Sequence, residues 1–429
     1  MSTQTISLSI SRPTVVKVLI SLAYAALISW LYINEVATTW GYQGFGVDYS
    51  AFSAVIIIFA TSMVAAAMPN EGDTRSMLLM LTHFLFFVPS IVFAFISGAH
   101  LTYIALLFSS IAVIIPLSGL AIKPIRTSPI RRSQFLPFLI ISSFIFVVLY
   151  ALLGNIRSLN FDLSAVYAVR AENVESLPGF LGYFVSLISA IMLPMAMIYS
   201  LATRNYVLLG AAIGLQLVFF GMTNFKNILF SPLLIIFIYL FAREPSRRLY
   251  LPYFFFGLPI AAMVNFLISR IVLQSEDLLF VVNNFIRRLL FAPPLLDNMH
   301  IQFFSENALY YWSTSRITFG LVESPYSQTA PFVIGLEFFQ FDTWAANTGI
   351  IGSGYSNAGA FGVLLYATLF GLLLALLNSY GKHLGHAFVT SLGVLTVMNI
   401  TRSSDFVTVL LTHGLVFLIA LLAVTPKEN

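Results

Sequence analysis

The stretch Ser76-Met-Leu-Leu-Met-Leu-Thr-His-Phe-Leu-Phe-Phe-Val-Pro-Ser-Ile-Val-Phe-Ala-Phe-Ile-Ser97 contains no Asp, Glu, Lys or Arg. A helix needs about 20 mostly apolar residues to cross the hydrocarbon core of a bilayer. This stretch is long enough, and its Pro89 suggests a kink, which membrane helices tolerate, rather than a break. It therefore predicts a membrane-spanning helix.

The composition of the whole chain agrees with this prediction. Of 429 residues, 59% are hydrophobic and only 9% are charged, whereas soluble domains carry about 25% charged residues. Such a chain cannot cover a water-facing surface of its own size. This excludes a soluble enzyme, a nucleic-acid binder and a disordered scaffold. The absence of cysteine excludes disulfides, iron–sulfur clusters and thiol catalysis.

Apolar runs of similar length recur along the chain, and the first is too long for a cleavable signal peptide. We predict twelve spans, at 14–34, 50–68, 76–97, 101–120, 135–154, 179–201, 205–221, 227–242, 250–269, 355–378, 384–400 and 405–424. Two of them, 205–221 and 227–242, are short. The sequence therefore predicts an all-α polytopic membrane protein in which residues 1–429 form a single membrane domain.

The charges between the spans predict the orientation. With the N-terminus in the cytoplasm, 13 of the 21 basic residues but only four of the 17 acidic residues lie on the cytoplasmic side. The basic clusters at 123–132 and 243–248 are both on that side, as the positive-inside rule requires. Adding or removing one span would place one cluster outside. We expect both termini to be cytoplasmic.

On this topology two substantial segments face outward, 155–178 and 271–354. The second contains an amphipathic pattern at 278–290, which predicts a helix that Pro293 and Pro294 end. A loop of this length without a function of its own is unusual in a compact protein. We therefore expect a large, partly helical outer loop that carries a functional site.

Basic residues that face outward against the topological bias are candidates for binding an anion. They are Arg157, Arg170, Lys226, Arg270, Arg287, Arg288, Arg316 and Arg402. Arg170, Lys226 and Arg402 each lie at the start of a span, where the helix dipole disfavours a cation by ~0.3–1 kcal/mol. For any one of them, pairing with an outer acid or a lipid phosphate is the commoner explanation. Together they indicate a shared anion near the outer face.

The segment Gly349-Ile-Ile-Gly-Ser-Gly-Tyr-Ser-Asn-Ala-Gly-Ala-Phe-Gly362 leads into the tenth span. It is not a nucleotide fingerprint, because no βαβ unit surrounds it. Gly354, Ala358 and Gly362 have the small-residue spacing of closely packed membrane helices. We expect close packing there, and free backbone amides at the helix start are also able to bind an oxyanion.

Candidates for a general base are several, and no pattern singles one out. Histidine suits that role near neutral pH. The histidines and acids that compete for it are His83, His300, His413, Asp297, Glu306, Glu337 and Asp342. No HExxH, GxSxG or P-loop pattern occurs in the chain. Metal-dependent hydrolysis and ATP-driven transport are therefore unsupported, and we expect neither metal nor cofactor.

Several short motifs resemble the oligosaccharide repeat unit (O-antigen) polymerase family. The similarity covers about 157–415 in the right order and spacing, and the motifs that carry it are Arg170-Ala-Glu…Leu177-Pro-Gly-Phe-Leu-Gly-Tyr183, Gly221…Lys226-Asn-Ile-Leu-Phe230, Arg287-Arg-Leu-Leu-Phe-Ala-Pro-Pro-Leu-Leu…Phe303-Phe-Ser-Glu-Asn-Ala308 and Asn347-Thr-Gly-Ile-Ile-Gly-Ser-Gly-Tyr…Gly359-Ala-Phe-Gly362. Some family members have Arg-x10-Gly in an outer loop, whereas here Arg170 is followed by Gly179 after eight residues and by Gly182 after eleven.

The resemblance implies a glycosyltransferase C-like, metal-independent, inverting enzyme of the bacterial inner membrane with a periplasmic active site. It would transfer a growing glycan from undecaprenyl pyrophosphate to the sugar of a new lipid-linked repeat unit, with a chain-length regulator as an expected partner. Fixed cations would stabilise the pyrophosphate leaving group. The pyrophosphate-binding candidates are Arg170, Lys226, Arg287, Arg288, Arg316 and Arg402.

The same reaction needs a base near the acceptor hydroxyl, for which we choose His300 and Glu306. Aromatic side chains in the large loop are candidates for stacking on sugar rings, with packing of the loop as the alternative. They are Tyr310, Tyr311, Trp312 and Trp344.

Two other functions stay open on the sequence. A lipid-linked oligosaccharide flippase or another secondary transporter also fits twelve spans, but it should show related halves and ionisable groups near the bilayer midplane. Here the charges lie at the outer edge and the halves look unlike. An O-antigen ligase, which joins finished glycan to lipid A core, would share the same physical chemistry.

Overall fold

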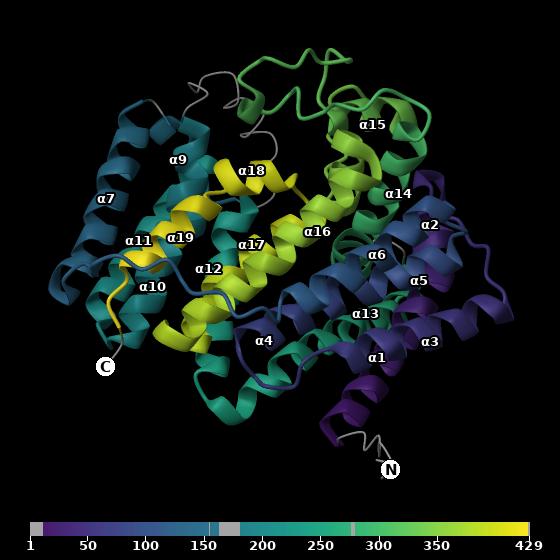
Figure 1. Cartoon of the computed structure of the whole chain (residues 1–429), viewed down its shortest axis with the longest axis horizontal. Coiled ribbons are helices and arrows are strands. Elements are labelled where there is room, and N and C mark those ends of the chain that lie inside the picture. The colour runs from purple at the N-terminus through teal and green to yellow at the C-terminus, as the bar shows by residue number, and fades with distance from the viewer. Residues whose placement is uncertain (1–11, 154, 163–180, 276–278, 428–429) are drawn as a thin grey trace, which may run out of the picture.

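The computed structural model describes residues 12–153, 155–162, 181–275 and 279–427, and within these ranges it contains helices and no strand. Figure 1 shows them as one bundle. The predicted all-α class is confirmed. The α-helices are α1 (Arg12–Leu31), α2 (Ala37–Trp40), α3 (Ala51–Ala67), α4 (Thr74–Thr82), α5 (Val88–Ile96), α6 (Leu101–Leu117), α7 (Arg132–Leu152), α9 (Leu181–Leu187), α10 (Leu193–Ala202), α11 (Tyr206–Thr223), α12 (Lys226–Ala242), α13 (Gly257–Leu267), α14 (Ala292–Phe304), α15 (Ala330–Phe339), α16 (Ile350–Leu384), α17 (His386–Arg402), α18 (Phe406–Leu411) and α19 (Leu415–Val424).

Shorter 3-10 and π-helical pieces connect or extend these helices. They are η1 (Tyr32–Val36), η2 (Gly41–Gln43), η3 (His83–Phe87), η4 (Asn155–Ser158), η6 (Ile188–Met192), η7 (Pro245–Phe256), η8 (Ile268–Val272), η9 (Val282–Phe291) and η10 (Arg316–Thr318).

Every one of the twelve predicted intervals is largely helical in the structure. Eight of the described helices are long and apolar enough to cross a membrane. The remaining intervals correspond to α3, α6, α12 and α17, each of 17 residues. A multi-pass membrane protein is thus supported, and the count of twelve spans stays a prediction.

The centre of the bundle is formed by α16 and α17, which pack against each other (Figure 1). Helix α16 also contacts α6, α14 and α4, while α17 contacts α12, α4 and α10. One group of helices, α7, α10, α11 and α12, lies on one side of this centre, and α1, α3, α5 and α13 lie on the other. The start of α1 and the end of α19 lie at one end of the molecule, away from α15 and the long segment 305–329.

Helix α16 is broken near its N-terminus. Ala358 and Gly359 have non-helical dihedral angles, and Gly359 has φ +59°, a conformation that glycine adopts without strain. The chain turns back there, so that Gly354 packs directly on Gly362, where added Cβ atoms would collide with the opposing backbone. The close packing expected of these small residues is present, but it joins two parts of one helix.

The segment predicted as a large outer loop is helical over much of its described part and belongs partly to the core. It contains η9, α14 and α15, and α14 packs against α16. The expected end of a helix at Pro293 and Pro294 is wrong. Both prolines lie in the first turn of α14, which follows η9 directly, so the helical conformation continues through them.

Candidate functional site

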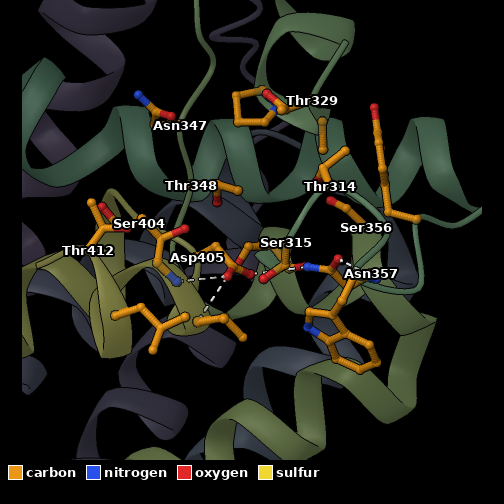
Figure 2. Close-up of a pocket in the computed structure, with 18 of the residues that line it drawn as sticks. Thr314, Ser315, Thr329, Asn347, Thr348, Ser356, Asn357, Ser404, Asp405 and Thr412 are labelled. Atoms are coloured by element: carbon orange, nitrogen blue, oxygen red, sulfur yellow. Dashed lines mark hydrogen bonds between the residues drawn. The ribbon is translucent and has the colours of Figure 1, made fainter. Parts of the chain in front are cut away.

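A polar cavity of about 520 Å³ lies where α14, the short N-terminal part of α16 and the α17–α18 turn meet. Figure 2 shows its labelled polar residues grouped around the central Asp405. Hydroxyl side chains dominate its wall, namely those of Thr314, Ser315, Thr329, Thr348, Ser353, Ser356, Ser403, Ser404, Thr408 and Thr412. Such a wall offers many hydrogen bonds and little net charge.

The break in α16 builds one side of this cavity. Just before it, the carbonyls of Ser356 and Asn357 accept hydrogen bonds from the backbone N–H groups of Tyr310 and Tyr311, at 2.9 and 2.8 Å. The side chain of Asn357 accepts a third from the N–H of Trp312, at 3.2 Å. Backbone groups that a continuous helix would satisfy internally are therefore used to hold the loop. Tyr310 and Trp312 consequently line the cavity.

Asp405 fixes the opposite wall, and both of its oxygens are occupied. Its Oδ1 caps α18 by accepting the N–H groups of Val407 and Thr408, at 2.9 and 3.2 Å. Its Oδ2 accepts a hydrogen bond from the amide of Asn357 at 3.1 Å (Figure 2). The same oxygen accepts one from the hydroxyl of Tyr366 at 2.7 Å. Asp405 thus joins α16 to the start of α18.

The hydrogen bonds continue from Asp405 into the aromatic wall. Tyr366 also accepts a hydrogen bond from the indole N–H of Trp312, at 2.6 Å. One chain therefore runs from Trp312 through Tyr366 to Asp405, and it sets the orientation of the Trp312 ring.

His300 lines the cavity but is almost fully buried. Its Nδ1 lies 2.7 Å from the hydroxyl of Ser356, and its Nε2 lies 3.0 Å from the carbonyl of Ala346. Burial lowers its pKa to about 4, so the ring is neutral at pH 7. Of the two predicted bases, His300 is in the cavity wall. Glu306 is exposed in a separate shallow depression with Glu337.

Asp297 lies one turn before His300 on α14 and holds the start of α16. Its Oδ1 accepts hydrogen bonds from the hydroxyl of Thr348 and from the N–H of Gly352. Its Oδ2 is buried without a hydrogen-bond partner among the described residues. Burial outweighs the two hydrogen bonds and raises its pKa to about 7.

The predicted anion-binding cations do not meet at one place in the described part of the chain. Arg316 lines the cavity, and its guanidinium lies over the ring of Tyr183, 4.9 Å from the centroid. Arg287 is held elsewhere, by Asn283, Gln43 and the ring of Trp40, and burial lowers its pKa. Arg288 is exposed on the same helix, and Lys226 begins α12. Arg170 lies outside the described residues, as does most of the segment 155–178.

Arg402 has its backbone beside the cavity and its side chain in the bundle. Gly349 packs so closely on Thr401 and Arg402 that a Cβ would collide with their backbone. The guanidinium Nε and Nη1 are buried without a hydrogen-bond partner among the described residues. Arg402 is not part of the cavity wall. An unpaired buried guanidinium is costly, so an anionic partner at this position would stabilise the bundle.

The four predicted aromatic residues have different surroundings. Tyr310 is buried, Trp312 is partly buried, and both line the cavity. Tyr311 is 57% exposed and does not line it. Trp344 packs edge-on against Phe339, with ring centroids 4.2 Å apart, and is likewise absent from the wall. Of the four, the partly buried Trp312 is therefore the one placed to stack on a ligand in the cavity, because the Tyr310 ring is buried against Phe304 and Tyr326.

An apolar groove of about 350 Å³ adjoins the cavity. It runs between α9–η6 and α18–α19, and it shares Tyr183 and Leu411 with the polar cavity. Gly414, with φ +75°, lets the α18–α19 turn pack on Leu187 and Ile191 of α9–η6. Several apolar side chains of the groove are exposed at the side of the bundle, namely Phe184, Leu411 and Val416.

Sequence reasoning missed the residues that build the cavity. Ser356, Asn357 and Tyr366 carry its hydrogen bonds but belong to apolar or glycine-rich segments. The usable signal was the polar run Ser403-Ser404-Asp405 directly before the last apolar run, because that combination is typical of a helix cap. In the described part no group of three His, Asp or Glu side chains is placed to hold a metal ion.

Compared with protein families, with well-characterised proteins and with solved structures, the chain matches none. The resemblance of its short motifs to the O-antigen polymerase family therefore stays a prediction, and the function has to be argued from the site itself.

Proposed function

We propose that this chain is a membrane-embedded inverting glycosyltransferase that polymerises lipid-linked O-antigen repeat units. One observation carries the proposal: a hydroxyl-rich cavity with aromatic side chains in its wall adjoins an exposed apolar groove. A ligand that fills both has a sugar part and a long apolar part. Lipid-linked oligosaccharides have this construction.

The cavity supports the sugar half of the proposal. Sugars present several hydroxyl groups and a flat apolar ring face. Hydroxyl and amide side chains such as those of Thr348, Ser404 and Asn347 both donate and accept hydrogen bonds. The ring of Trp312 offers an apolar surface and is fixed in place by its bond to Tyr366. Because Asp405 is fully paired, the cavity presents little free negative charge.

The groove supports the lipid half. Its lining residues are almost all apolar, and it adjoins the last long apolar helix pair, α18–α19. A polyprenyl chain has no hydrogen-bonding groups, so it can lie against this apolar surface while it stays in the bilayer. With the chain in the groove, the pyrophosphate would lie near the shared wall, beside Tyr183. Arg316 lies over the Tyr183 ring and is the arginine in the described wall of the cavity.

The reaction would use the residues of the cavity as follows. A neutral His300 accepts the proton of the acceptor hydroxyl, whose oxygen attacks the anomeric carbon of the donor glycan. The bond from that carbon to the pyrophosphate breaks, and Arg316 stabilises the charge that develops on the leaving group. Arg170, Lys226 and Arg402 remain proposed contributors. Arg287 is proposed with less support, since it is already held by Gln43 and Trp40.

The proposed setting is the bacterial inner membrane with the cavity facing the periplasm. There the substrates would be newly flipped lipid-linked repeat units, and a chain-length regulator would be the protein partner. Both chain ends would then be cytoplasmic.

The test is polymerisation by the purified chain in lipid vesicles supplied with an undecaprenyl-pyrophosphate-linked repeat unit. We expect a ladder of glycans on a gel, and its loss in Arg316→Ala. Arg204→Ala is the matched control, because Arg204 is an exposed arginine in the α10–α11 turn and does not line the cavity. No ladder from the unmodified chain would refute the proposal.

A second measurement separates the polymerase from the ligase and the flippase. Surface lipopolysaccharide from cells lacking the chain should carry core with a single repeat unit. Loss of every repeat unit would indicate a flippase or a ligase instead.

A further inference from the structure

The hydroxyl of Ser356 lies between two possible acceptors. Its Oγ is 2.6 Å from the carbonyl of Gly352 and 2.7 Å from Nδ1 of His300. Ser356 and His300 both line the cavity. On the far side of the ring, Nε2 of His300 is 3.0 Å from the carbonyl of Ala346. A serine has one hydroxyl hydrogen, so it cannot donate fully to both Gly352 and His300.

The carbonyl of Ala346 decides which ring nitrogen carries a proton. A carbonyl only accepts, so its contact is a hydrogen bond only when Nε2 carries the hydrogen. In neutral His300, Nδ1 is then the acceptor and takes the hydroxyl hydrogen of Ser356, which leaves the Gly352 carbonyl without it. In charged His300, Nδ1 donates to Ser356, and Ser356 donates to Gly352. All three contacts are satisfied only in the charged form, which burial disfavours.

His300 has no nitrogen free to meet a ligand directly, because both are engaged. Ser356 lines the cavity as well, and its hydroxyl already contacts Nδ1. A proton leaving a hydroxyl in the cavity therefore has a path through Ser356 to His300, and its arrival completes the hydrogen bonds around the ring.

We propose that Ser356 relays the proton of the acceptor hydroxyl to His300 during glycan transfer. This inference rests on the proposed function. The acceptor hydroxyl gives its proton to Oγ of Ser356 while the original Ser356 hydrogen passes to Nδ1 of His300. The acceptor oxygen bonds to the anomeric carbon, and the bond from that carbon to the lipid pyrophosphate breaks with its electron pair. The proton rests on His300 and returns by the same path to solvent after product leaves.

Ser353 provides an internal comparison. It lies one turn earlier on the same part of α16, lines the same cavity and donates to the carbonyl of Gly349 at 2.6 Å. Its hydroxyl has no histidine partner in the described part of the chain. Ser353 and Ser356 thus lie on the same helix, are both buried, and each donate a hydrogen bond to the carbonyl four residues earlier. They differ in that only Ser356 contacts His300 among the described residues.

Other titratable and charged groups surround His300 without meeting its ring. They are Asp297 on α14, Tyr310 and Arg316 on the adjoining loop, Tyr366 on α16, and Asp405 and His413 beside α18. Among the described contacts, the ring nitrogens bond only to Ser356 and Ala346. A pH dependence that appears when the Ser356 hydroxyl is removed therefore belongs to the Ser356–His300 pair.

The experiment measures kcat and KM of the reconstituted full chain between pH 5.5 and 8.5, with the lipid-linked repeat unit as substrate. The unmodified chain should have a nearly flat kcat, since His300 is neutral throughout this range. Ser356→Ala should lower kcat by about 100-fold at pH 7 with little change in KM. Its kcat should rise about tenfold per pH unit, because hydroxide replaces the lost base.

His300→Gln should reproduce this loss, and the double variant should lose no more, because two residues of one relay are not additive. Ser353→Ala should keep the flat profile. If Ser356→Ala folds poorly, Ser356→Thr and Ser356→Val can be compared instead. The two side chains have the same shape, and only threonine has the hydroxyl that the relay needs, so the valine variant alone should lose activity. Two results would overturn the relay. One is a kcat of Ser356→Ala that does not change with pH, and the other is a loss of kcat in the double variant equal to the product of the losses in the two single variants. An inactive unmodified chain would instead overturn the proposed function.

Discussion

Asp405 lines the polar cavity and Asp297 lies behind its wall on α14, and the two differ in how completely they are paired. Asp405 accepts four hydrogen bonds, two on each oxygen, and caps its own helix, α18. Asp297 caps a helix from a different part of the chain, α16, and has one oxygen without a partner in the described structure. A buried carboxylate is stable in its charged form only when its lone pairs are used. Asp405 therefore links α16 to α18 through four hydrogen bonds, whereas burial raises the pKa of the half-paired Asp297 to about 7.

Removing the fully paired aspartate should have the largest effect on stability. Asp405→Ala leaves donors on Asn357, Tyr366, Val407 and Thr408 without an acceptor. A lost helix cap costs about 1 kcal/mol and each unsatisfied buried donor about 1–3 kcal/mol, so we expect a loss of ~4 kcal/mol. The measurement is thermal unfolding of the detergent-solubilised protein. Asp405→Asn keeps an accepting oxygen and should lose less than half as much, and equal losses would contradict this account.

The half-paired Asp297 should make the free energy of unfolding depend on pH. The pKa of Asp297 is raised from its ordinary value to about 7 in the folded chain. The folded state therefore holds this proton more tightly than the unfolded state. Its contribution to stability is complete below about pH 4 and is lost as pH rises toward 7, by at most ~1.4 kcal/mol per unit.

Asp297→Asn tests this directly because it removes the titration and keeps an accepting oxygen. Between pH 5 and pH 7 the unfolding midpoint of the unmodified protein should fall more than that of the variant. Parallel curves would show that Asp297 does not titrate in this range.

The smallest effect on stability is expected when one of the four hydrogen-bond donors to Asp405 is removed. Tyr366→Phe removes one of the four hydrogen bonds and leaves the indole N–H of Trp312 without its acceptor. We expect a loss of about 1–2 kcal/mol in the free energy of unfolding, again from thermal melts. In the Asp405→Asn background the same change should lower the free energy of unfolding by less, because the hydrogen bonds to residue 405 are already weakened. If the losses in the free energy of unfolding of the two single variants add, Tyr366 and Asp405 stabilise the fold independently.

The membrane helices could be predicted from the sequence because their signal is local. Runs such as 76–97 are apolar enough to be helices whatever surrounds them, and the structure has helices at every predicted interval. Boundaries that depend on packing were less predictable. Pro293 and Pro294 predict the end of a helix. In the structure the chain stays helical there, since η9 leads directly into α14.

The site was only partly predictable, since it joins segments far apart in the chain. Asn357 and Asp405 are separated by 48 residues, and His300 and Ser356 by 56. Counting charges directed attention to cations such as Arg287, whose partners are Gln43 and Trp40. Neutral residues such as Ser356 and Asn357 carry no comparable signal, although they build the wall of the cavity.

The cavity and the groove adjoin each other at Tyr183 and Leu411, and Leu411 ends α18, a helix of six residues that is only ~9 Å long. A ligand whose tail stays in the bilayer can then present its head to the cavity without leaving the membrane. Encounter becomes a two-dimensional search within the leaflet. The occupancy of such a site depends on the number of ligand molecules per unit of membrane area, and diluting the surrounding water changes nothing.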